Sequence, residues 1–311
     1  MIVYTESETL AQDLGIPAST LFSVSFHLGR HYHRVEIPKR DGGTRLLSVP
    51  DPILKRIQRA VLRVLLFHIP ISPYATAYRP GVGIRNNAVP HCGRKAVLRL
   101  DILHFFDSVR YSQIKEKVFP AAVYSEKLRV LLSCLCYGRD GLPQGAPTSP
   151  VISNILLREF DFAVGDWCHT RGIRYTRYCD DMIFSGDFDP APVIRMVAEA
   201  LQREGFRLNT RKIRFARQGQ RQSVTGVVVN ERPRMDSGGR RALRAALYYC
   251  QKYGVKDHLA RMKDPRTEEE YLRSLLGQLD FALSLSKEPE LAAGRGWVLE
   301  QLRALSSSSK Q

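Results

Sequence analysis

Two adjacent carboxylates, Asp180 and Asp181, are the side chains of this sequence best suited to chemistry. The segments on either side, Ile173–Tyr178 and Met182–Ser185, are rich in aromatic and β-branched residues and predict the two strands of a β-hairpin. We therefore expect the pair to be exposed in the turn. Carboxylates about 4 Å apart repel by roughly 4 kcal/mol at an effective dielectric near 20, so cations or hydrogen bonds must offset this cost. Oxygen ligands without nearby Cys or His favour magnesium over other metals. Judged by these residues alone, the alternative to a metal site is an ordinary acidic turn.

A third carboxylate follows a separate predicted strand. Ala96–Asp101 has strand-like spacing that turns Leu98 and Leu100 to one side and Asp101 to the other. If this strand lies beside the hairpin, three carboxylates meet. They would then form a two-metal site, in which one ion activates an attacking hydroxyl and the other stabilises a departing pyrophosphate.

The composition indicates a soluble protein with an anionic partner. The 311 residues suffice for two or three subdomains, and 44% hydrophobic with 25% charged residues is ordinary for a globular chain. A formal charge of +16 favours nucleic acid or, less well, an anionic membrane surface. We expect no membrane span and no export signal, hence a cytoplasmic protein, and the six scattered cysteines predict reduced thiols.

Basic residues gather in two consecutive segments that are expected to position phosphates. Ile37–Leu46 predicts a hairpin whose glycine pair permits a tight turn, and its basic side chains are suited to closing over a triphosphate. Pro52–Leu66 has helical spacing of its apolar residues. Its basic side chains either track phosphates or form a solvated face, namely Lys55, Arg56, Arg59 and Arg63.

Three later segments complete the pattern. Gly141–Pro150 predicts a loop leading into a helix, where Gln144 and hydroxyl groups offer hydrogen bonds. Val224–Asn230 predicts a strand in which Gly226 permits close backbone approach. From Pro233 onward the sequence is mostly helical, with basic residues beside tyrosines, a combination that suits nucleic acid.

In this order and spacing, the segments Leu100–Val109, Leu142–Pro150 and Tyr178–Asp181 make the chain resemble the reverse transcriptases over roughly residues 37 to 230. Within that family, the segments Asn87–His91 and Val224–Gly226 are similar to two additional signatures of the bacterial retron enzymes.

The resemblance implies an α+β right-hand polymerase fold, with residues 1–95 as N-terminal region and fingers, 96–232 as a palm with an antiparallel sheet and a fingers insertion at about 112–140, and 233–311 as a helical thumb. It implies that Asp101, Asp180 and Asp181 bind two Mg²⁺ ions and that Phe106 blocks a ribose 2′-hydroxyl. Nucleotide-binding roles are implied for Lys39, Arg45, Phe106, Gln144 and Lys212, the last as a proton donor to pyrophosphate. RNA-binding roles are implied for Asn87, His91, Val224, Thr225 and Gly226.

The same resemblance implies RNA-directed synthesis of multicopy single-stranded DNA from dNTPs, copied from a cognate structured noncoding RNA and primed from the 2′-hydroxyl of an internal guanosine. The expected partners are that RNA, its branched RNA-DNA product, a host RNase H that removes template, and a separate effector protein in antiphage defence, without a membrane. Cys179 stands where many relatives have Ala, and both residues are small.

Two other readings remain open at this point. A diversity-generating or CRISPR-linked bacterial reverse transcriptase would lack the Asn87–His91 and Val224–Gly226 signatures. A catalytically silent RNA-binding scaffold would have no need to keep a costly cluster of carboxylates.

Overall fold

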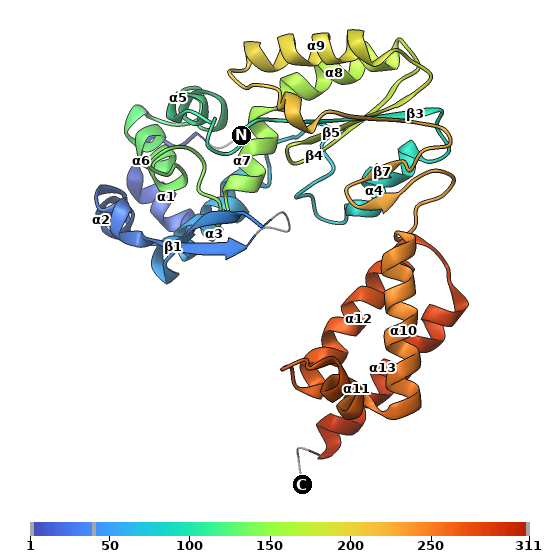
Figure 1. The fold of residues 1–311 in the computed structure, drawn as a ribbon. Coiled ribbons are helices and arrows are strands. Elements are labelled where there is room, and N and C mark those ends of the chain that lie inside the picture. Colours follow the sequence, from blue (N-terminus) through green and yellow to red (C-terminus); the bar gives the residue numbers. More distant parts are fainter. Residues whose placement is uncertain (1–2, 39–41, 309–311) are drawn as a thin grey trace. The chain divides into compact units, whose positions relative to one another are not determined.

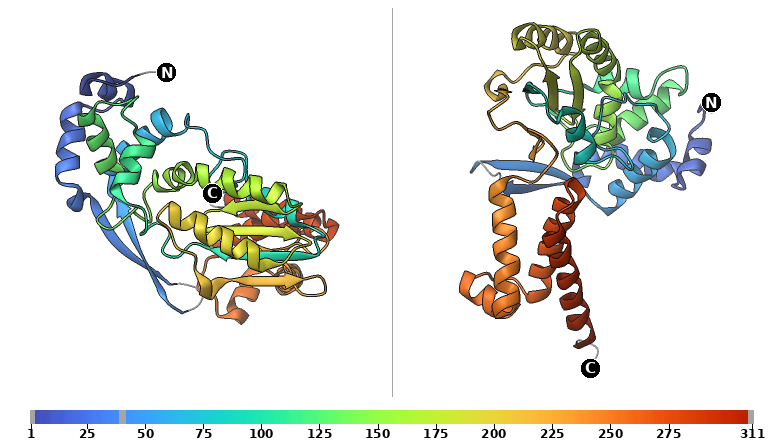
Figure 2. Two further views of the ribbon diagram at one scale, coloured as in Figure 1. Left: turned by 90° about the horizontal axis from the view of Figure 1, so that it is seen from above. Right: turned by 90° about the vertical axis from the view of Figure 1, so that its right-hand side faces the viewer.

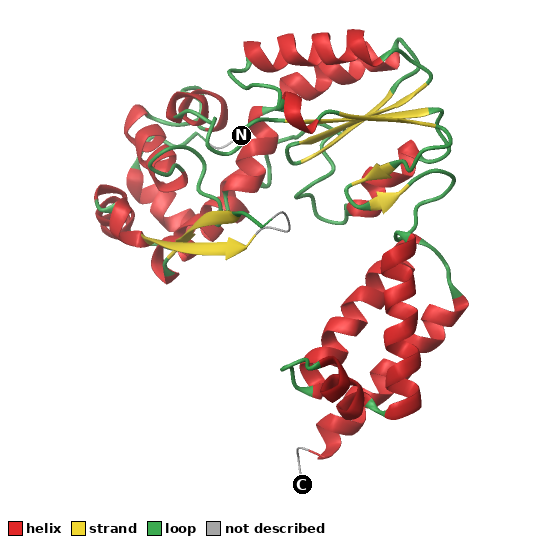
Figure 3. Ribbon diagram, viewed as in Figure 1, coloured by secondary structure: helices red, strands yellow, loops and turns green. Residues whose placement is uncertain are grey.

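A computed structural model describes residues 3–38 and 42–308. The backbone divides into two compact units, of which unit 1 holds Met1–Val82 with Leu98–Phe215 and unit 2 holds Gly83–Val97 with Ala216–Gln311. Helices and antiparallel strands occur together (Figures 1 and 3). The α+β class predicted from the sequence is therefore confirmed.

A four-stranded sheet forms the centre of unit 1. Its strand order is β4-β5-β3-β6, and β4 pairs with β5 in antiparallel register. Helices α8 and α9 cover one face of this sheet (Figure 1). The bounds are Ala96–Asp101 for β3, Arg174–Tyr178 for β4, Asp181–Gly186 for β5, Arg214–Arg217 for β6, Arg158–His169 for α8 and Pro190–Arg203 for α9.

Helix α9 illustrates why the sequence folds in this way. Asp189 caps its first turn by accepting a hydrogen bond from the backbone N–H of Ala191, and a proline occupies the first helical position. Its buried residues, Val193, Val197 and Leu201, recur every four positions. They form one apolar stripe, which lets the helix bury that face.

The remainder of unit 1 is a group of helices and a hairpin. The helix expected within Pro52–Leu66 is present, and Asp51 caps it by accepting from the N–H of Leu54. Lys39, for which the resemblance implies nucleotide binding, lies outside the described residues. The elements are α1 (Ser7–Leu14), α2 (Ala18–Phe26), α3 (Pro52–Val61), α5 (Tyr111–Gln113), α6 (Glu126–Cys136), α7 (Ser149–Leu156), β1 (Tyr32–Pro38), β2 (Thr44–Pro50), the 3₁₀ turns η1 (Leu28–His31) and η5 (Thr210–Lys212), and the π-helical turns η2 (Leu62–Leu66) and η4 (Ile114–Val118).

Unit 2 contains a helical bundle with a hydrophobic core of its own. Leu243, Leu247, Leu272 and Leu279 belong to this core. Figure 2 shows the helices after residue 236 that contribute to it. The helices are α10 (Ser237–Tyr253), α11 (Val255–Met262), α12 (Glu268–Leu285) and α13 (Pro289–Ser308). The mostly helical character predicted from Pro233 onward is confirmed.

The continuous strand predicted over Val224–Asn230 is wrong. The segment instead contains two short strands, β7 (Ser223–Val224) and β8 (Val227–Val228), joined by a turn at Thr225 and Gly226. Both turn residues have positive φ, 45° and 84°, as a two-residue type I′ hairpin requires. A Cβ on Gly226 would meet no atom within 4 Å, so this glycine serves the turn conformation and not a close backbone approach. Unit 2 also holds α4 (Ile84–Ala88) and the 3₁₀ turn η3 (Val89–His91).

All six cysteines are free thiols, as expected. Over residues 3–38 and 42–308, no helix is long and apolar enough to cross a membrane.

Candidate active site

Asp101 ends strand β3 on the face opposite the core. Leu98 and Leu100 are fully buried on one side of the strand, and Arg99 shares the other side with Asp101. Asn209 fixes the carboxylate, because its amide donates to Oδ1 at 2.9 Å and its backbone N–H donates to the carbonyl of Asp101 at 2.8 Å. The ammonium of Lys212 lies 2.8 Å from Oδ2. Only 5% of Asp101 is exposed, so its carboxylate has little access to water. The contacts with Asn209 and Lys212 offset the cost of burying its charge.

The β4–β5 hairpin carries the other two carboxylates. Its register pairs Tyr178 with Asp181, so Cys179 and Asp180 form the two-residue turn and Asp181 is the first residue of β5. Cys179 has a φ of 60°, which a side chain other than glycine rarely adopts. The N–H of Ile102 donates to the carbonyl of Asp180 at 3.2 Å, which joins the turn to the chain just beyond β3.

The expectation that the acidic pair is exposed is wrong, because Asp180 and Asp181 are only partly accessible. Burial, together with the nearby charge of Asp101 and of the adjacent aspartate, raises the pKa of Asp180. Burial also raises the pKa of Asp181, while the guanidinium of Arg99, 3.4 Å away, opposes this shift. The site therefore concentrates negative charge that favours a cation.

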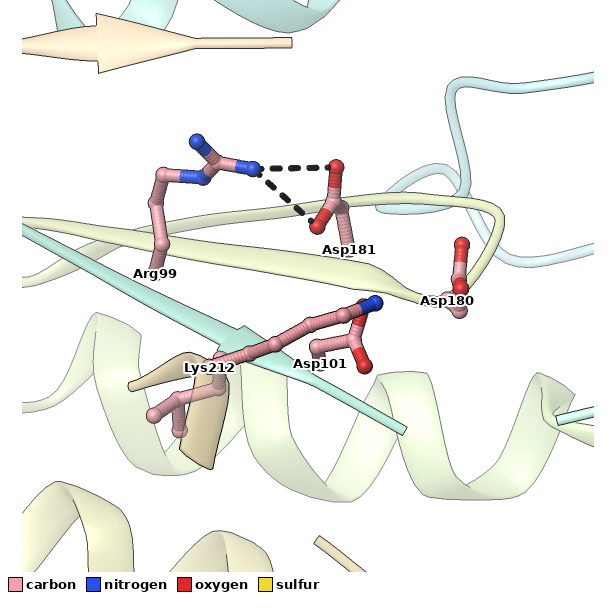
Figure 4. A pocket seen from close by; sticks show the side chains of 6 residues that line it. Arg99, Asp101, Asp180, Asp181 and Lys212 are labelled. Atoms are coloured by element: carbon pink, nitrogen blue, oxygen red, sulfur yellow. Dashed lines mark hydrogen bonds and ion pairs between the residues drawn. The ribbon is translucent and has the colours of Figure 1, made fainter. Parts of the chain in front are cut away.

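All three carboxylates line a single pocket of about 250 Å³, together with Arg99, Leu100 and Lys212. Figure 4 shows the ammonium of Lys212 reaching the carboxylate of Asp101, Asp180 at the hairpin turn, and Arg99 paired with Asp181. The sequence prediction that these distant aspartates are brought together is thus confirmed. The pocket offers hard oxygen ligands between two cationic side chains, an arrangement suited to binding phosphate and metal.

The oxygen donors fit magnesium, which binds through one or two carboxylates plus substrate phosphates. Across the described part of the chain, no three His, Cys, Asp or Glu side chains are grouped closely enough to form a complete metal site. Lys212 and Arg99 engage two of the three carboxylates here, at Asp101 and Asp181. Partial engagement by cations and the raised pKa of Asp180 both indicate that positive charge stabilises this cluster.

A buried ion pair supports the turn formed by Cys179 and Asp180. Arg177 on β4 and Asp161 on α8 are both fully buried, and Nη2 of the arginine lies 2.6 Å from Oδ2 of the aspartate. A second guanidinium nitrogen, Nη1, donates to the carbonyl of Cys179 at 2.9 Å. Tyr175 also donates its hydroxyl to Asp161 at 2.8 Å. The strained turn is thereby tied to helix α8.

The loop that carries Gln144 lies beside the segment of Phe106, the two residues for which the resemblance implies nucleotide binding. The carbonyl of Phe106 accepts from the N–H of Leu142 at 2.9 Å, and the Gln144 amide lies 3.5 Å from Oδ1 of Asp107. The loop also reaches strand β2, because the carbonyl of Gln144 accepts from the N–H of Ser48 at 2.9 Å.

Gly145 makes that approach to β2 possible. It has a φ of 131°, and a Cβ there would lie 2.8 Å from the carbonyl oxygen of Ser48. An alanine therefore requires the loop or the strand to shift. Arg45, the remaining described residue of this predicted set, is exposed on β2 opposite Ile37.

The retron-type signatures lie together in unit 2. The Asn87 amide donates to the hydroxyl of Thr225 at 3.3 Å, which joins α4 to the β7–β8 turn. Asn87, His91 and Val224 are fully buried, and burial lowers the pKa of His91 to about 3. These side chains thus shape the backbone around them, and the exposed Gly226 is the signature residue most open to a partner.

Sequence reasoning missed four residues that position the carboxylates. Arg99 had a usable signal, since it lies two residues before Asp101 on a strand and must share its face. The other three, Asn209, Arg177 and Asp161, act through contacts between residues distant in sequence. No local sequence pattern predicts such contacts.

Comparison with known proteins agrees with this geometry. Residues 37–232 match the reverse transcriptase (RNA-dependent DNA polymerase) family. The retron Mx65 reverse transcriptase of Myxococcus xanthus is 36% identical over 79% of this chain and 63% of its own length. The retron Mx162 reverse transcriptase of the same organism is 32% identical over 98% of this chain and 68% of its own length. The retron Ec83 reverse transcriptase of Escherichia coli is 30% identical, over 68% of this chain and 72% of its own length. The chain thus spans about two thirds of the length of these curated relatives.

Proposed function

Because the chain belongs to the reverse transcriptase (RNA-dependent DNA polymerase) family, and within it to the bacterial retron enzymes, we propose that it copies part of a cognate structured noncoding RNA into multicopy single-stranded DNA. The observation that carries this proposal is the pocket lined by Asp101, Asp180 and Asp181. An RNA-directed DNA polymerase needs such a carboxylate cluster, whereas a silent RNA-binding scaffold does not.

Asp101, Asp180 and Asp181 would hold two Mg²⁺ ions, which supply activation of the attacking hydroxyl and stabilisation of the departing pyrophosphate. Asn209 orients Asp101 through two hydrogen bonds, so that its carboxylate keeps one direction. Arg177 holds the turn that carries Asp180 by binding the carbonyl of Cys179. These contacts preorganise the pocket, which lowers the reorganisation needed in the transition state.

We assign Lys212 the role of proton donor to pyrophosphate. Its hydrogen bond to Asp101 raises the pKa of its ammonium, so the proton is held on Nζ at neutral pH. The side chain is 60% exposed and lines the catalytic pocket, so it remains accessible to a bound nucleotide. A protonated amine beside the departing oxygen would neutralise charge as it develops.

Phe106, Gln144, Arg45 and Lys39 would bind the incoming dNTP. The half-buried ring of Phe106 packs 5.3 Å from that of Phe105, measured between ring centroids, which holds it in place as a barrier to a ribose 2′-hydroxyl. Gln144 would contact the nucleotide from the adjoining loop, and the two basic side chains would meet the triphosphate.

The retron assignment extends the proposal to substrate and partners. Priming would start from the 2′-hydroxyl of an internal guanosine and leave a branched RNA-DNA product, with template removed by a host RNase H in the cytoplasm. A separate effector protein would complete an antiphage system. The signature residues Asn87, His91 and Val224–Gly226 would act on RNA chiefly by shaping the surface around the β7–β8 turn, since three of them are buried.

Purification of the protein from its host tests this proposal. We expect a bound nucleic acid whose DNA part resists RNase and whose mobility changes after treatment with a 2′,5′-debranching enzyme. The Asp180→Asn variant should carry RNA without DNA. Recovery of unbranched DNA from the wild-type protein would contradict retron priming and favour another class of bacterial reverse transcriptase.

A further inference from the structure

A second cavity of unit 1 lies apart from the catalytic pocket and shares no lining residue with it. It encloses about 580 Å³ and is bounded by Leu14 and Gly15 at the end of α1 and by the exposed side of α3. This volume falls within the range of roughly 300–1,000 Å³ that is typical of ligand sites.

Every charged side chain that lines this cavity is a cation. They are Lys55, Arg56, Arg59 and Arg63, which we call the α3 cradle. The lysine is half-buried and the three arginines are exposed. Within the part of the chain that the structure describes, none of the four forms an ion pair.

The nearest acidic residues in the sequence are engaged elsewhere. Asp13 accepts a hydrogen bond from the hydroxyl of Tyr4 at 2.8 Å. Asp51 pairs with His31 at 2.8 Å and caps α3 through the N–H of Leu54. The carbonyl groups at the end of α1 contribute only about half a negative charge against four positive ones. The cavity therefore keeps a strong positive potential.

This arrangement is unfavourable without an anion. Lys55 and Arg59, like Arg59 and Arg63, are like charges four residues apart on a helix, and such pairs destabilise it. Arg129 shows the contrasting case, since it meets two glutamates within 2.8 Å. Two observations distinguish the cradle from a solvated basic face: its cations line a cavity, and no acidic side chain lines that cavity.

We infer that the α3 cradle binds the phosphate backbone of RNA at a position outside the catalytic pocket. Along a helix, Lys55 to Arg63 extend over about 12 Å, which corresponds to roughly three to four nucleotides at about 3.4 Å per nucleotide of one duplex strand. Three guanidinium groups can each bind phosphate in bidentate fashion. Such contacts fix the position of the RNA and carry no sequence preference. That the ligand carries phosphate follows from the basic lining of the cavity. That the ligand is RNA rests on the proposed function.

The triple variant Arg56→Gln/Arg59→Gln/Arg63→Gln tests the inference in the full-length protein. The probe is a fluorescein-labelled RNA hairpin with a single-stranded tail, titrated by anisotropy in EDTA at several salt concentrations. We expect affinity at physiological salt to fall about 10- to 100-fold and the slope of log K against log salt to become shallower by about 2. The kcat for extension of oligo(dT) on poly(rA) should stay unchanged at saturating primer-template.

Two control variants separate the cradle from net charge. Arg174→Gln/Arg195→Gln/Arg203→Gln removes the same charge from exposed positions of β4 and α9, and it should keep the wild-type affinity. Replacing the three cradle arginines by lysine should keep the salt slope, since phosphate still meets three cations, and should weaken binding less than glutamine does, although bidentate contacts are lost.

Equal loss of affinity in both glutamine variants would overturn the inference, because binding would then follow total charge alone. An unchanged affinity of the cradle variant would also overturn it. Inorganic phosphate and a DNA duplex serve as competitors: displacement of RNA by millimolar phosphate alone would assign the cavity to a free anion. The proposed polymerase function fails separately, by absence of primer extension in the wild-type protein.

Discussion

The guanidinium of Arg177 donates a 2.9 Å hydrogen bond to the carbonyl of Cys179, at the positive-φ position of the turn that presents Asp180. The same guanidinium forms a fully buried ion pair with Asp161. One side chain therefore links the hydrophobic interior of unit 1 to the geometry of the catalytic pocket.

Arg177→Met should lower the free energy of unfolding by about 3–5 kcal/mol, because Asp161 is left buried and unpaired. The double variant Arg177→Met/Asp161→Leu should regain much of that stability, since both charges are gone. It should not regain primer extension, because the carbonyl of Cys179 remains without its donor. Urea denaturation and extension assays measure the two effects. Recovery of activity in parallel with stability would show that Arg177 has no positioning role.

Phe106→Ala should reduce discrimination against ribonucleotides by at least about tenfold, because the proposed barrier to the 2′-hydroxyl is removed. The ratio of kcat/KM for dGTP and GTP on one template measures this. Phe105→Leu is the matched control, since that ring is buried beside Phe106 and its loss should affect stability more than sugar selection. An unchanged ratio in Phe106→Ala would remove the proposed role.

Gly145→Ala should raise the KM for dNTPs about tenfold, because its Cβ would lie 2.8 Å from the carbonyl of Ser48 and displace Gln144. Gly172→Ala separates conformational strain from contact: Gly172 also has positive φ, 67°, but a Cβ there would meet no atom within 4 Å. Both variants should lose stability, by roughly 1 kcal/mol from strain. The KM should change only in Gly145→Ala, and equal changes in both would contradict this account of the loop.

Because His91 is buried, we expect acid to destabilise the folded protein. Burial lowers its pKa in the folded protein to about 3, whereas the unfolded value is near 6.5. Below pH 6.5 the unfolded chain binds a proton that the folded chain does not, so stability falls with pH until the folded pKa is reached. From pH 7 to pH 5 the loss is about 2 kcal/mol. The urea midpoint of His91→Gln should change less over this range than that of the wild-type protein, and equal changes would exclude His91 as the cause.

The elements that carry the three aspartates were predictable because their signals are local. Strand alternation placed Asp101 opposite Leu98 and Leu100, and two β-rich segments flanking Asp180 and Asp181 indicated a hairpin. Their union in one pocket depended on the resemblance to a family, since no periodicity states which strands are neighbours. The hydrogen bond from the N–H of Ile102 to the carbonyl of Asp180 holds the end of β3 beside the hairpin turn. It joins residues far apart in sequence.

The misjudged features depend on tertiary context. Partial burial of Asp180 and Asp181 arises from the surrounding segments, which a turn pattern cannot reveal. The Thr225 and Gly226 turn was missed because Val224 to Val229 read as one β-branched run, although a two-residue turn ending in glycine is a known hairpin signal. Asp161 gives no sign in the sequence that it serves Arg177.

Primer extension by Asp180→Asn/Asp181→Asn is the most direct test of the claim that the three aspartates form a polymerase site. With dTTP, poly(rA) and oligo(dT), we predict a loss of roughly a thousandfold or more, equivalent to several kcal/mol of transition-state stabilisation, while RNA binding persists. Asp166→Asn/Glu199→Gln, which removes two exposed carboxylates of α8 and α9, should extend the primer like the wild-type protein. Extension at the wild-type rate by Asp180→Asn/Asp181→Asn would contradict the account.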